Sequence, residues 1–252
     1  MPAQPTSNPG PGDPAETIIL KRKARPEELV ASEPKTAPTN GGGPQPIAPG
    51  LLYLALGDSY TIGEKVTGAE RFPGQLAIRL RTAGVEMRSP QIVARTGWTT
   101  ADLWTQVALG APGAPQGTYD LVTLLIGVNN QYRGLSLDTY RREFEMLAAR
   151  AVELTAGDPG RVIVLSIPDW GVTPYARNFD RALIRQQIDK FNQVNREIAA
   201  AHGTRYVNLT PLTRKCGDDP ALISADGLHP AAKQYAQWVD LLFPEALSAL
   251  RQ

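Results

Sequence analysis

Short apolar runs alternate with segments of helical period along most of this chain, and no other feature limits its fold so strongly. Five runs are too short for helices and are candidate strands: residues 51–56, 91–94, 121–126, 162–167 and 205–208. The first, third and fourth are almost continuously apolar, as expected for strands that helices cover on both faces. The alternation predicts an α/β fold with about five parallel strands joined by helical crossovers.

The helical segments are read from their apolar stripes. Apolar residues recur at steps of three and four over 137–154 and, with one polar interruption, over 184–198. Such stripes indicate helices that pack on a core and not a cofactor site. His202-Gly203 is expected to close the second helix, because glycine permits a left-handed cap and histidine suits the helix dipole. The last helix is expected to begin at Pro230, which has no N–H group to leave unpaired.

Residues 1–48 differ in composition from the rest of the chain. They contain ten of its 22 prolines and no aromatic residue, and their five positive charges are matched by five negative ones. Such a segment cannot bury enough apolar surface to offset its ordering entropy. We expect a disordered Pro/Gly-rich arm, with 17–20 as a candidate short strand, followed by one domain over 49–252.

Charge and hydropathy exclude several classes of protein. The 252 residues carry a formal net charge of +1, which argues against a nucleic-acid partner. No apolar stretch approaches the roughly 20 residues that a transmembrane span requires. The N-terminus lacks the basic start and apolar centre of a signal peptide, so a cytoplasmic location is expected. Nothing in the sequence indicates an oligomeric state.

Polar motifs follow the candidate strands. Gly57-Asp58-Ser59 follows the first, and the segments 95–98 and 127–130 follow the second and third. The segment 226–230, Asp-Gly-Leu-His-Pro, comes after the last strand. Because ligands bind outside the carboxyl ends of parallel strands, these motifs can converge on one edge of the sheet.

The first and last motifs supply the three residues of a serine hydrolase triad. A serine hydroxyl is a poor nucleophile at neutral pH and needs a base and an orienting carboxylate. Ser59, His229 and Asp226 fit the roles of nucleophile, general base and orienting acid. Their mechanism passes through an acyl-enzyme and requires no metal and no organic cofactor.

The four motifs together resemble those of the SGNH, or GDSL-type, hydrolase family. Ser59, Gly97, Asn129 and the pair Asp226 and His229 match its four blocks in order, over about residues 51–250. The resemblance implies a three-layer α/β/α sandwich around a central parallel sheet, and an enzyme acting on a small-molecule ester. It also implies an oxyanion hole formed by the backbone N–H groups of Ser59 and Gly97 and by the Asn129 amide.

One residue departs from the family pattern. The third block usually reads Gly-x-Asn-Asp, and here its last residue is Asn130. The expected amide donor, Asn129, is retained. Support for the site from Asn130 is expected to differ in detail, because an amide lacks the charge of a carboxylate.

Several assignments stay open at this point. Four aromatic residues either line a substrate pocket or pack in the core: Tyr60, Trp98, Trp170 and Tyr175. Arg133 either meets an anionic substrate or faces solvent. Cys216 is expected to be an unreactive thiol.

Rival functions are a metal-dependent phosphoesterase using Asp58 and Asp226, and a non-catalytic flavodoxin-like binding module. The phosphoesterase is disfavoured because the chain offers few histidine ligands for a metal. The binding module is disfavoured because no glycine-rich phosphate loop follows the first strand. A short-chain carboxylesterase is the expected substrate class, with lysophospholipase or carbohydrate acetylesterase as alternatives. An α/β-hydrolase scaffold is disfavoured because the Ser59 motif lacks the second glycine of a nucleophile elbow.

Overall fold

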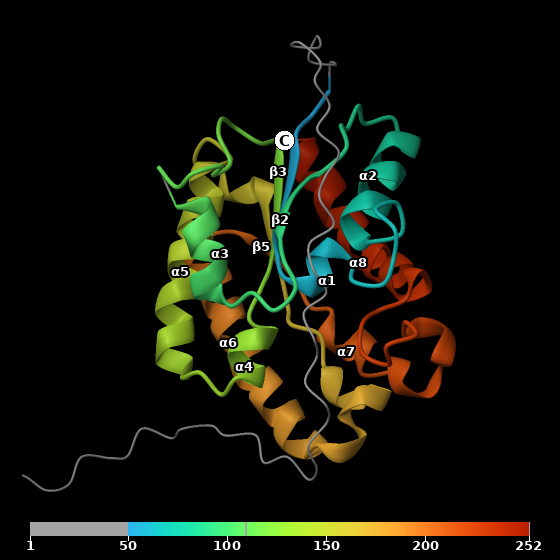
Figure 1. Cartoon of the computed structure of the whole chain (residues 1–252). Helices are drawn as coiled ribbons and strands as arrows, with labels where there is room; N and C mark the ends of the chain where they lie inside the picture. Colours follow the sequence, from blue (N-terminus) through green and yellow to red (C-terminus); the bar gives the residue numbers. More distant parts are fainter. Residues whose placement is uncertain (1–49, 109, 252) are drawn as a thin grey trace, which may run out of the picture.

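The computed structural model describes residues 50–108 and 110–251, which form a parallel β-sheet between two layers of helices (Figure 1). Its strands are β1 (Tyr53–Gly57), β2 (Gln91–Ala94), β3 (Leu121–Leu125), β4 (Val162–Leu165) and β5 (Arg205–Val207). Each of the five expected strands is present, and the predicted α/β/α fold is confirmed. The expected arm at 1–48, with its candidate strand at 17–20, lies outside the described residues.

The strand order is β2-β1-β3-β4-β5, and every pairing is parallel. The chain therefore leaves β1 toward one side to form β2 and returns to the other side to form β3. In open sheets of this type ligands bind at such a reversal, outside the carboxyl ends of the strands. The loops after β1, β2 and β3 meet there.

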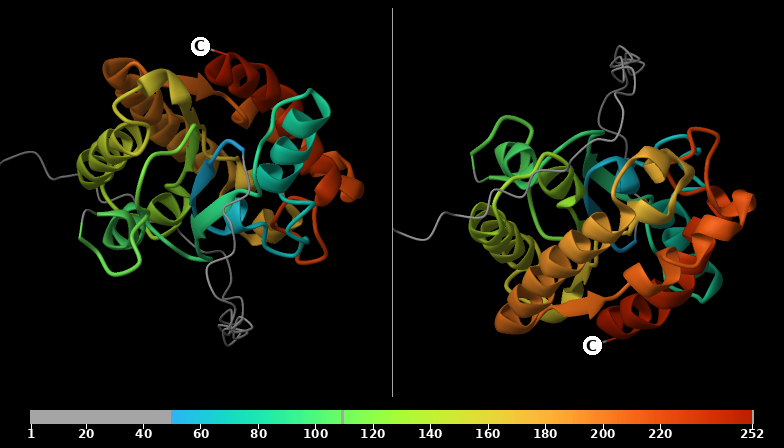
Figure 2. Two further views of the ribbon diagram at one scale, coloured as in Figure 1. Left: turned by 90° about the horizontal axis from the view of Figure 1, so that it is seen from above. Right: turned by 90° about the horizontal axis from the view of Figure 1, so that it is seen from below.

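Helices cover both faces of the sheet (Figures 1 and 2). One layer contains α2 (Phe72–Thr82) and α8 (Ala232–Leu250). The other contains α3 (Thr100–Val107), α5 (Leu137–Glu153) and α6 (Arg181–His202). Short helices occupy the loops at the functional edge: α1 (Ser59–Ile62), α4 (Val128–Tyr132) and α7 (Thr210–Thr213). Single 3-10 turns span Pro159–Arg161, Trp170–Val172, Pro174–Asn178, Cys216–Asp218 and Pro220–Leu222.

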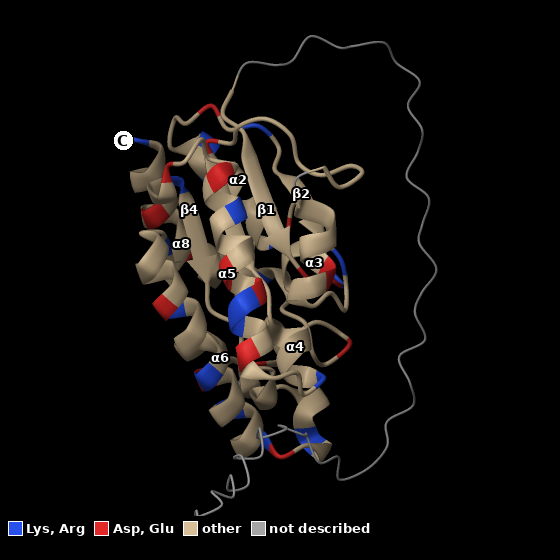
Figure 3. Cartoon of the chain, turned by 90° about the vertical axis from the view of Figure 1, so that its left-hand side faces the viewer, with Lys and Arg blue, Asp and Glu red and all other residues tan. Residues whose placement is uncertain are grey.

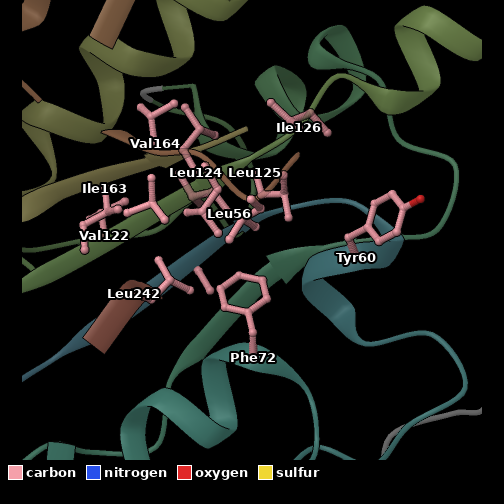
Figure 4. Packing of buried hydrophobic residues seen from close by; sticks show 14 of the residues in the cluster. Leu56, Tyr60, Phe72, Val122, Leu124, Leu125, Ile126, Ile163, Val164 and Leu242 are labelled. Carbon is pink, nitrogen blue, oxygen red and sulfur yellow. The ribbon is translucent and has the colours of Figure 1, made fainter. Parts of the chain in front are cut away.

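The core between β1, α2 and α8 is largely apolar. Leu56 of β1, Phe72 of α2 and Leu242 of α8 are all shielded from solvent and lie together in one cluster (Figure 4). Burying side chains of this size stabilises the fold by about 1.5 to 3 kcal/mol each. The two helices of this layer also fix the position of α1, which carries Ser59.

Two helix ends test the sequence-based expectations. α6 ends at His202, and Gly203 adopts the left-handed conformation expected of a cap, with φ of 71°. The expectation that the last helix begins at Pro230 is wrong, because α8 begins at Ala232. Pro230 instead forms an antiparallel bridge with Ile223, and the Ala231 N–H donates to the Leu222 carbonyl. This pairing keeps Pro230 and Ala231 in an extended conformation, so the helix begins at the next residue.

The layer formed by α3, α5 and α6 presents a mixed surface. Lys, Arg, Asp and Glu residues of both signs are interspersed on it (Figure 3). Arg141 and Glu197, for example, form an ion pair between α5 and α6 at 2.6 Å. Within the part of the chain that the structure describes, none of the helices is both apolar and long enough to cross a membrane.

Gly57 closes β1 where no larger residue fits. A Cβ atom there would overlap the Thr61 side chain and the carbonyl oxygen of Leu125 in the neighbouring strand. The requirement is one of space, since the backbone of Gly57 has no positive φ.

We expect Gly57→Ala to lower the free energy of unfolding by about 2 to 3 kcal/mol, because the added methyl group has no room to relax beside backbone. Urea unfolding of the variant measures the loss. Gly68→Ala is the control: its new Cβ would have no neighbour closer than 3.7 Å, so it should leave stability nearly unchanged. Equal stability of the two variants would contradict the packing argument.

Candidate active site

The turn after β1 places Ser59 at the start of a short helix. Asp58 caps α1 by accepting the Tyr60 N–H at 3.0 Å, and the Ser59 carbonyl accepts the Gly63 N–H at 3.1 Å. Tyr235 of α8 donates its hydroxyl to the Tyr60 carbonyl at 2.9 Å. Ser59 is therefore held by its own helix and by the layer behind it.

Asp58 itself is buried beside Ser59 and is 1% exposed. Burial raises the pKa of its carboxyl to about 7, and the hydrogen bond from Tyr60 only partly opposes that rise. The carboxyl carries its proton in acid and is ionised only above neutral pH. It thereby makes the nucleophile turn sensitive to pH.

The turn after β2 presents Gly97. This turn is closed by the Trp98 N–H, which donates to the Arg95 carbonyl at 3.2 Å. Gly97 has a φ of 84°, a left-handed conformation that glycine adopts without strain. Two side chains of the Asn129 segment reach this turn. Asn129 Nδ2 donates to the Trp98 carbonyl at 2.8 Å, and Arg133 Nη2 donates to the Gly97 carbonyl at 2.6 Å.

Asp226 and His229 form a tight pair in the loop before α8. His229 Nδ1 lies 2.6 Å from Asp226 Oδ2. The other carboxylate oxygen, Oδ1, accepts the backbone N–H groups of Leu228 at 2.9 Å and His229 at 3.0 Å. One carboxylate thus folds the turn and orients the ring.

The charge state of Asp226 follows from these contacts. Partial burial raises its pKa, but the hydrogen bonds from the His229 ring and from the Leu228 and His229 N–H groups outweigh burial and lower it to about 2. The carboxylate is therefore ionised at any pH at which a histidine base can act.

The structure brings the separate motifs to one edge of the sheet. The rings of Tyr60 and His229 meet edge to face, with centroids 5.7 Å apart, so the residue that follows Ser59 contacts the imidazole. No hydrogen bond joins Ser59 to His229 among the described residues. Such bonds are often long in unliganded enzymes and shorten when substrate binds.

Asn130, the departure from the family pattern, is fully buried and bonded at both ends. Its Oδ1 accepts the Thr100 N–H at 3.0 Å, and its Nδ2 donates to Thr100 Oγ1 at 2.6 Å. Thr100 Oγ1 in turn donates to Glu143 of α5. Thr100 Oγ1 has one hydrogen and donates it to Glu143, so its second partner must be a donor. The Asn130 amide supplies that donor, and a carboxylate would not.

Structure resolves most of the assignments left open by the sequence. Tyr60 and Trp170 are buried, and Trp170 Nε1 donates to Gln131 Oε1 at 2.8 Å, so both have a packing role. Trp98 and Tyr175 are only partly buried and pack on the edge of the core. Cys216 is buried, its Sγ donates to the Leu212 carbonyl, and burial raises the pKa of the thiol.

Three supporting residues were not found from the sequence. Thr96 donates its hydroxyl to Glu64, which follows α1, and Tyr235 holds α1 from α8. Arg133 was assigned to substrate or solvent, but its guanidinium binds the Gly97 carbonyl. Its position four residues after Asn129, on the same side of a helix, was the one available signal.

Metal ligands are sparse in this region. Among residues 50–108 and 110–251, the structure contains no group of three or more His, Cys, Asp or Glu side chains that could hold a metal ion.

Comparisons with known proteins agree with this geometry. Residues 55–237 match the GDSL-like Lipase/Acylhydrolase family. The fold is similar to the crystal structure of TesA, with a TM-score of 0.59 and 21% identity over 79% of this chain and 99% of that one. It is also similar to Axe2, an acetylxylan esterase from Geobacillus stearothermophilus, with a TM-score of 0.56 and 17% identity over 78% and 94%.

A lipase/acylhydrolase from Enterococcus faecalis gives a TM-score of 0.56 and 20% identity over 77% of this chain and 94% of that one. At these identities the likenesses show a common fold. No curated protein sequence matches the chain.

Asp58 gives the protein a pH-dependent stability. Between the pKa of an unfolded aspartate, 3.8, and its folded value of about 7, the native state holds a proton that the unfolded state lacks. The contribution of Asp58 to stability is therefore complete below pH 3.8 and is lost progressively as the pH rises from 3.8 to about 7. Relative to Asp58→Asn, the wild type should lose about 3 kcal/mol between pH 5 and pH 8. Urea unfolding at both pH values measures this, and parallel profiles for the two proteins would refute it.

Asn130→Asp should destabilise the fold although it restores the usual family residue. A carboxylate cannot donate to Thr100 Oγ1. The new carboxylate oxygen and Thr100 Oγ1 would then be two buried acceptors with no hydrogen between them, at a cost of about 1 to 3 kcal/mol. Thermal unfolding of this variant is compared with that of Asn208→Asp, which makes the same change at an exposed position. If both variants unfold at the wild-type temperature, the Thr100 contact has no energetic importance.

Proposed function

The chain belongs to the GDSL-like lipase/acylhydrolase family of ester hydrolases, and from this premise we propose that it is a serine carboxylesterase with a preference for short acyl groups. Ser59 is the proposed nucleophile, His229 the general base and Asp226 the residue that orients His229. The contact that carries the proposal is the 2.6 Å pair between His229 Nδ1 and Asp226 Oδ2, at the same sheet edge as Ser59.

In the first half-reaction, Ser59 Oγ attacks the ester carbonyl carbon as His229 Nε2 takes the hydroxyl proton. Asp226, ionised as its lowered pKa requires, accepts a hydrogen bond from His229 Nδ1–H and stabilises the imidazolium without taking its proton. The bond to the alcohol oxygen then breaks, His229 returns the proton to that oxygen, and the acyl group remains on Ser59.

In the second half-reaction, a water molecule gives its proton to His229 and its oxygen attacks the acyl carbon. The bond from that carbon to Ser59 Oγ breaks, and His229 returns the proton to the serine. The products are the free acid and the original enzyme.

Each attack places negative charge on the carbonyl oxygen. The proposed donors are the N–H groups of Ser59 and Gly97 and the Nδ2 group of Asn129. Asn129 donates one hydrogen to the Trp98 carbonyl, and an amide nitrogen carries a second hydrogen that can reach the oxyanion. Removing one such donor costs about 10² to 10³ in kcat.

The structural likeness to Axe2, an acetylxylan esterase, supports small acyl groups. It also makes acetyl esters of sugars the second candidate class.

The test is hydrolysis of p-nitrophenyl esters from acetate to palmitate by the wild type, with and without EDTA, and by Ser59→Ala. We expect activity to be highest on acetate or butyrate and unaffected by EDTA. In Ser59→Ala it should fall by about 10⁴-fold or more, because triad members act as a unit. Asp226→Asn, which disturbs the ring tautomer, should retain binding but lose most of kcat.

Ser89→Ala, at an exposed serine away from these motifs, is the matched control and should behave as the wild type. Full activity in Ser59→Ala would remove the proposed nucleophile. A maximum at palmitate would keep the nucleophile and replace short-chain preference with lipid specificity. Acetylated xylooligosaccharides and lysophospholipids are assayed in parallel to separate the substrate classes.

A further inference from the structure

The turn that carries Gly97 is attached to its surroundings at three successive residues. The Thr96 hydroxyl donates to Glu64, the Gly97 carbonyl accepts from Arg133 and the Trp98 carbonyl accepts from Asn129. The first contact comes from the nucleophile segment, and the other two come from α4 and its cap.

Asn129 and Arg133 hold this turn from one rigid element. They lie one helical turn apart, and the Arg133 N–H donates to the Asn129 carbonyl at 3.0 Å. Each donates to one of two consecutive carbonyls, those of Trp98 and Gly97. Two attachment points fix both the distance and the orientation of the turn relative to α4, whereas a single bond would leave it free to pivot.

The contact from Arg133 is strong and lies at the surface. A guanidinium is charged at every relevant pH, and a hydrogen bond from a charged donor is roughly twice as strong as a neutral one. Arg133 is exposed, and at 2.6 Å its Nη2 atom is close to the Gly97 oxygen. The side chain thus anchors the turn without forming part of the core.

We propose that Arg133 is a positioning residue that holds the Gly97 N–H at a fixed distance from the Asn129 amide, so that both donors meet the same oxyanion. The inference rests on the proposed function, because it assigns Arg133 to the oxyanion site of the Ser59 mechanism. Arg133 touches neither the substrate nor the reacting atoms. Its effect passes through the Gly97 carbonyl.

The predicted kinetic signature is a loss in kcat with little change in KM. Misplacing a catalytic group by about 1 Å can cost about 10²-fold in rate, and the two remaining attachments, to Glu64 and Asn129, limit the displacement here. We expect Arg133→Met to lower kcat on p-nitrophenyl acetate about tenfold and to change KM less than twofold. Arg133→Lys, which can still donate one charged hydrogen bond, should recover part of the loss.

A second readout removes any dependence on acyl specificity. A fluorophosphonate reacts with an activated serine: a bond forms between Ser59 Oγ and phosphorus, fluoride leaves, and the serine proton passes to His229. Its phosphoryl oxygen develops charge where the ester oxyanion would lie. Mass spectrometry should show labelling of Arg133→Met about ten times slower than that of the wild type, with unchanged urea unfolding.

Arg142→Met is the matched control, because Arg142 is also exposed and donates one side-chain hydrogen bond, to Thr139. It should match the wild type in kcat and in labelling. The proposal is overturned if Arg133→Met also matches the wild type, or if its loss in kcat comes with an equal loss of stability. Ser59→Ala separates the two hypotheses: if it is neither active nor labelled while Arg133→Met is unimpaired, only the role of Arg133 fails. Retained activity in Ser59→Ala would instead reject the proposed function.

Discussion

The parallel pairing of β1 with both β2 and β3 determines where the functional loops of this chain lie. Because β1 is central to that trio, the three loops that follow these strands leave the sheet side by side at its carboxyl edge. Ser59, Gly97 and Asn129 each belong to one of these loops. Strand pairing thereby brings residues separated by 70 positions to one place.

The fourth segment reaches the same edge by a different route, and its structure depends on one carboxylate. Asp226 accepts two backbone N–H groups through one oxygen and the His229 ring through the other. Its lowered pKa keeps it charged, so the turn and the ring orientation persist together over a wide pH range. The contact of His229 with Tyr60 then joins this segment to the nucleophile helix.

Local patterns in the sequence predicted the strands, α5, α6 and the Gly203 cap, because these depend on periodicity and on backbone preference. Contacts between distant residues were not predictable. The start of α8 is displaced by the bridge between Pro230 and Ile223, and Arg133 binds a carbonyl 36 residues away. Motif matching identified Asn130 as unusual, but only the structure shows that Thr100 and Glu143 require its amide.

The short helix α4 joins the loops of this site through amide side chains. Three consecutive side chains of α4 each bind a different segment: Asn129 binds Trp98, Asn130 binds Thr100 and Gln131 binds Trp170 and Gln187. An amide both donates and accepts hydrogen bonds and has no charge to gain or lose as the pH changes. One five-residue helix therefore ties the turn after β2, the start of α3, the loop after β4 and α6 together, and these ties are independent of pH. Asp58, whose pKa burial raises to about 7, instead caps the short helix that carries Ser59, so a change in its charge acts on the nucleophile turn.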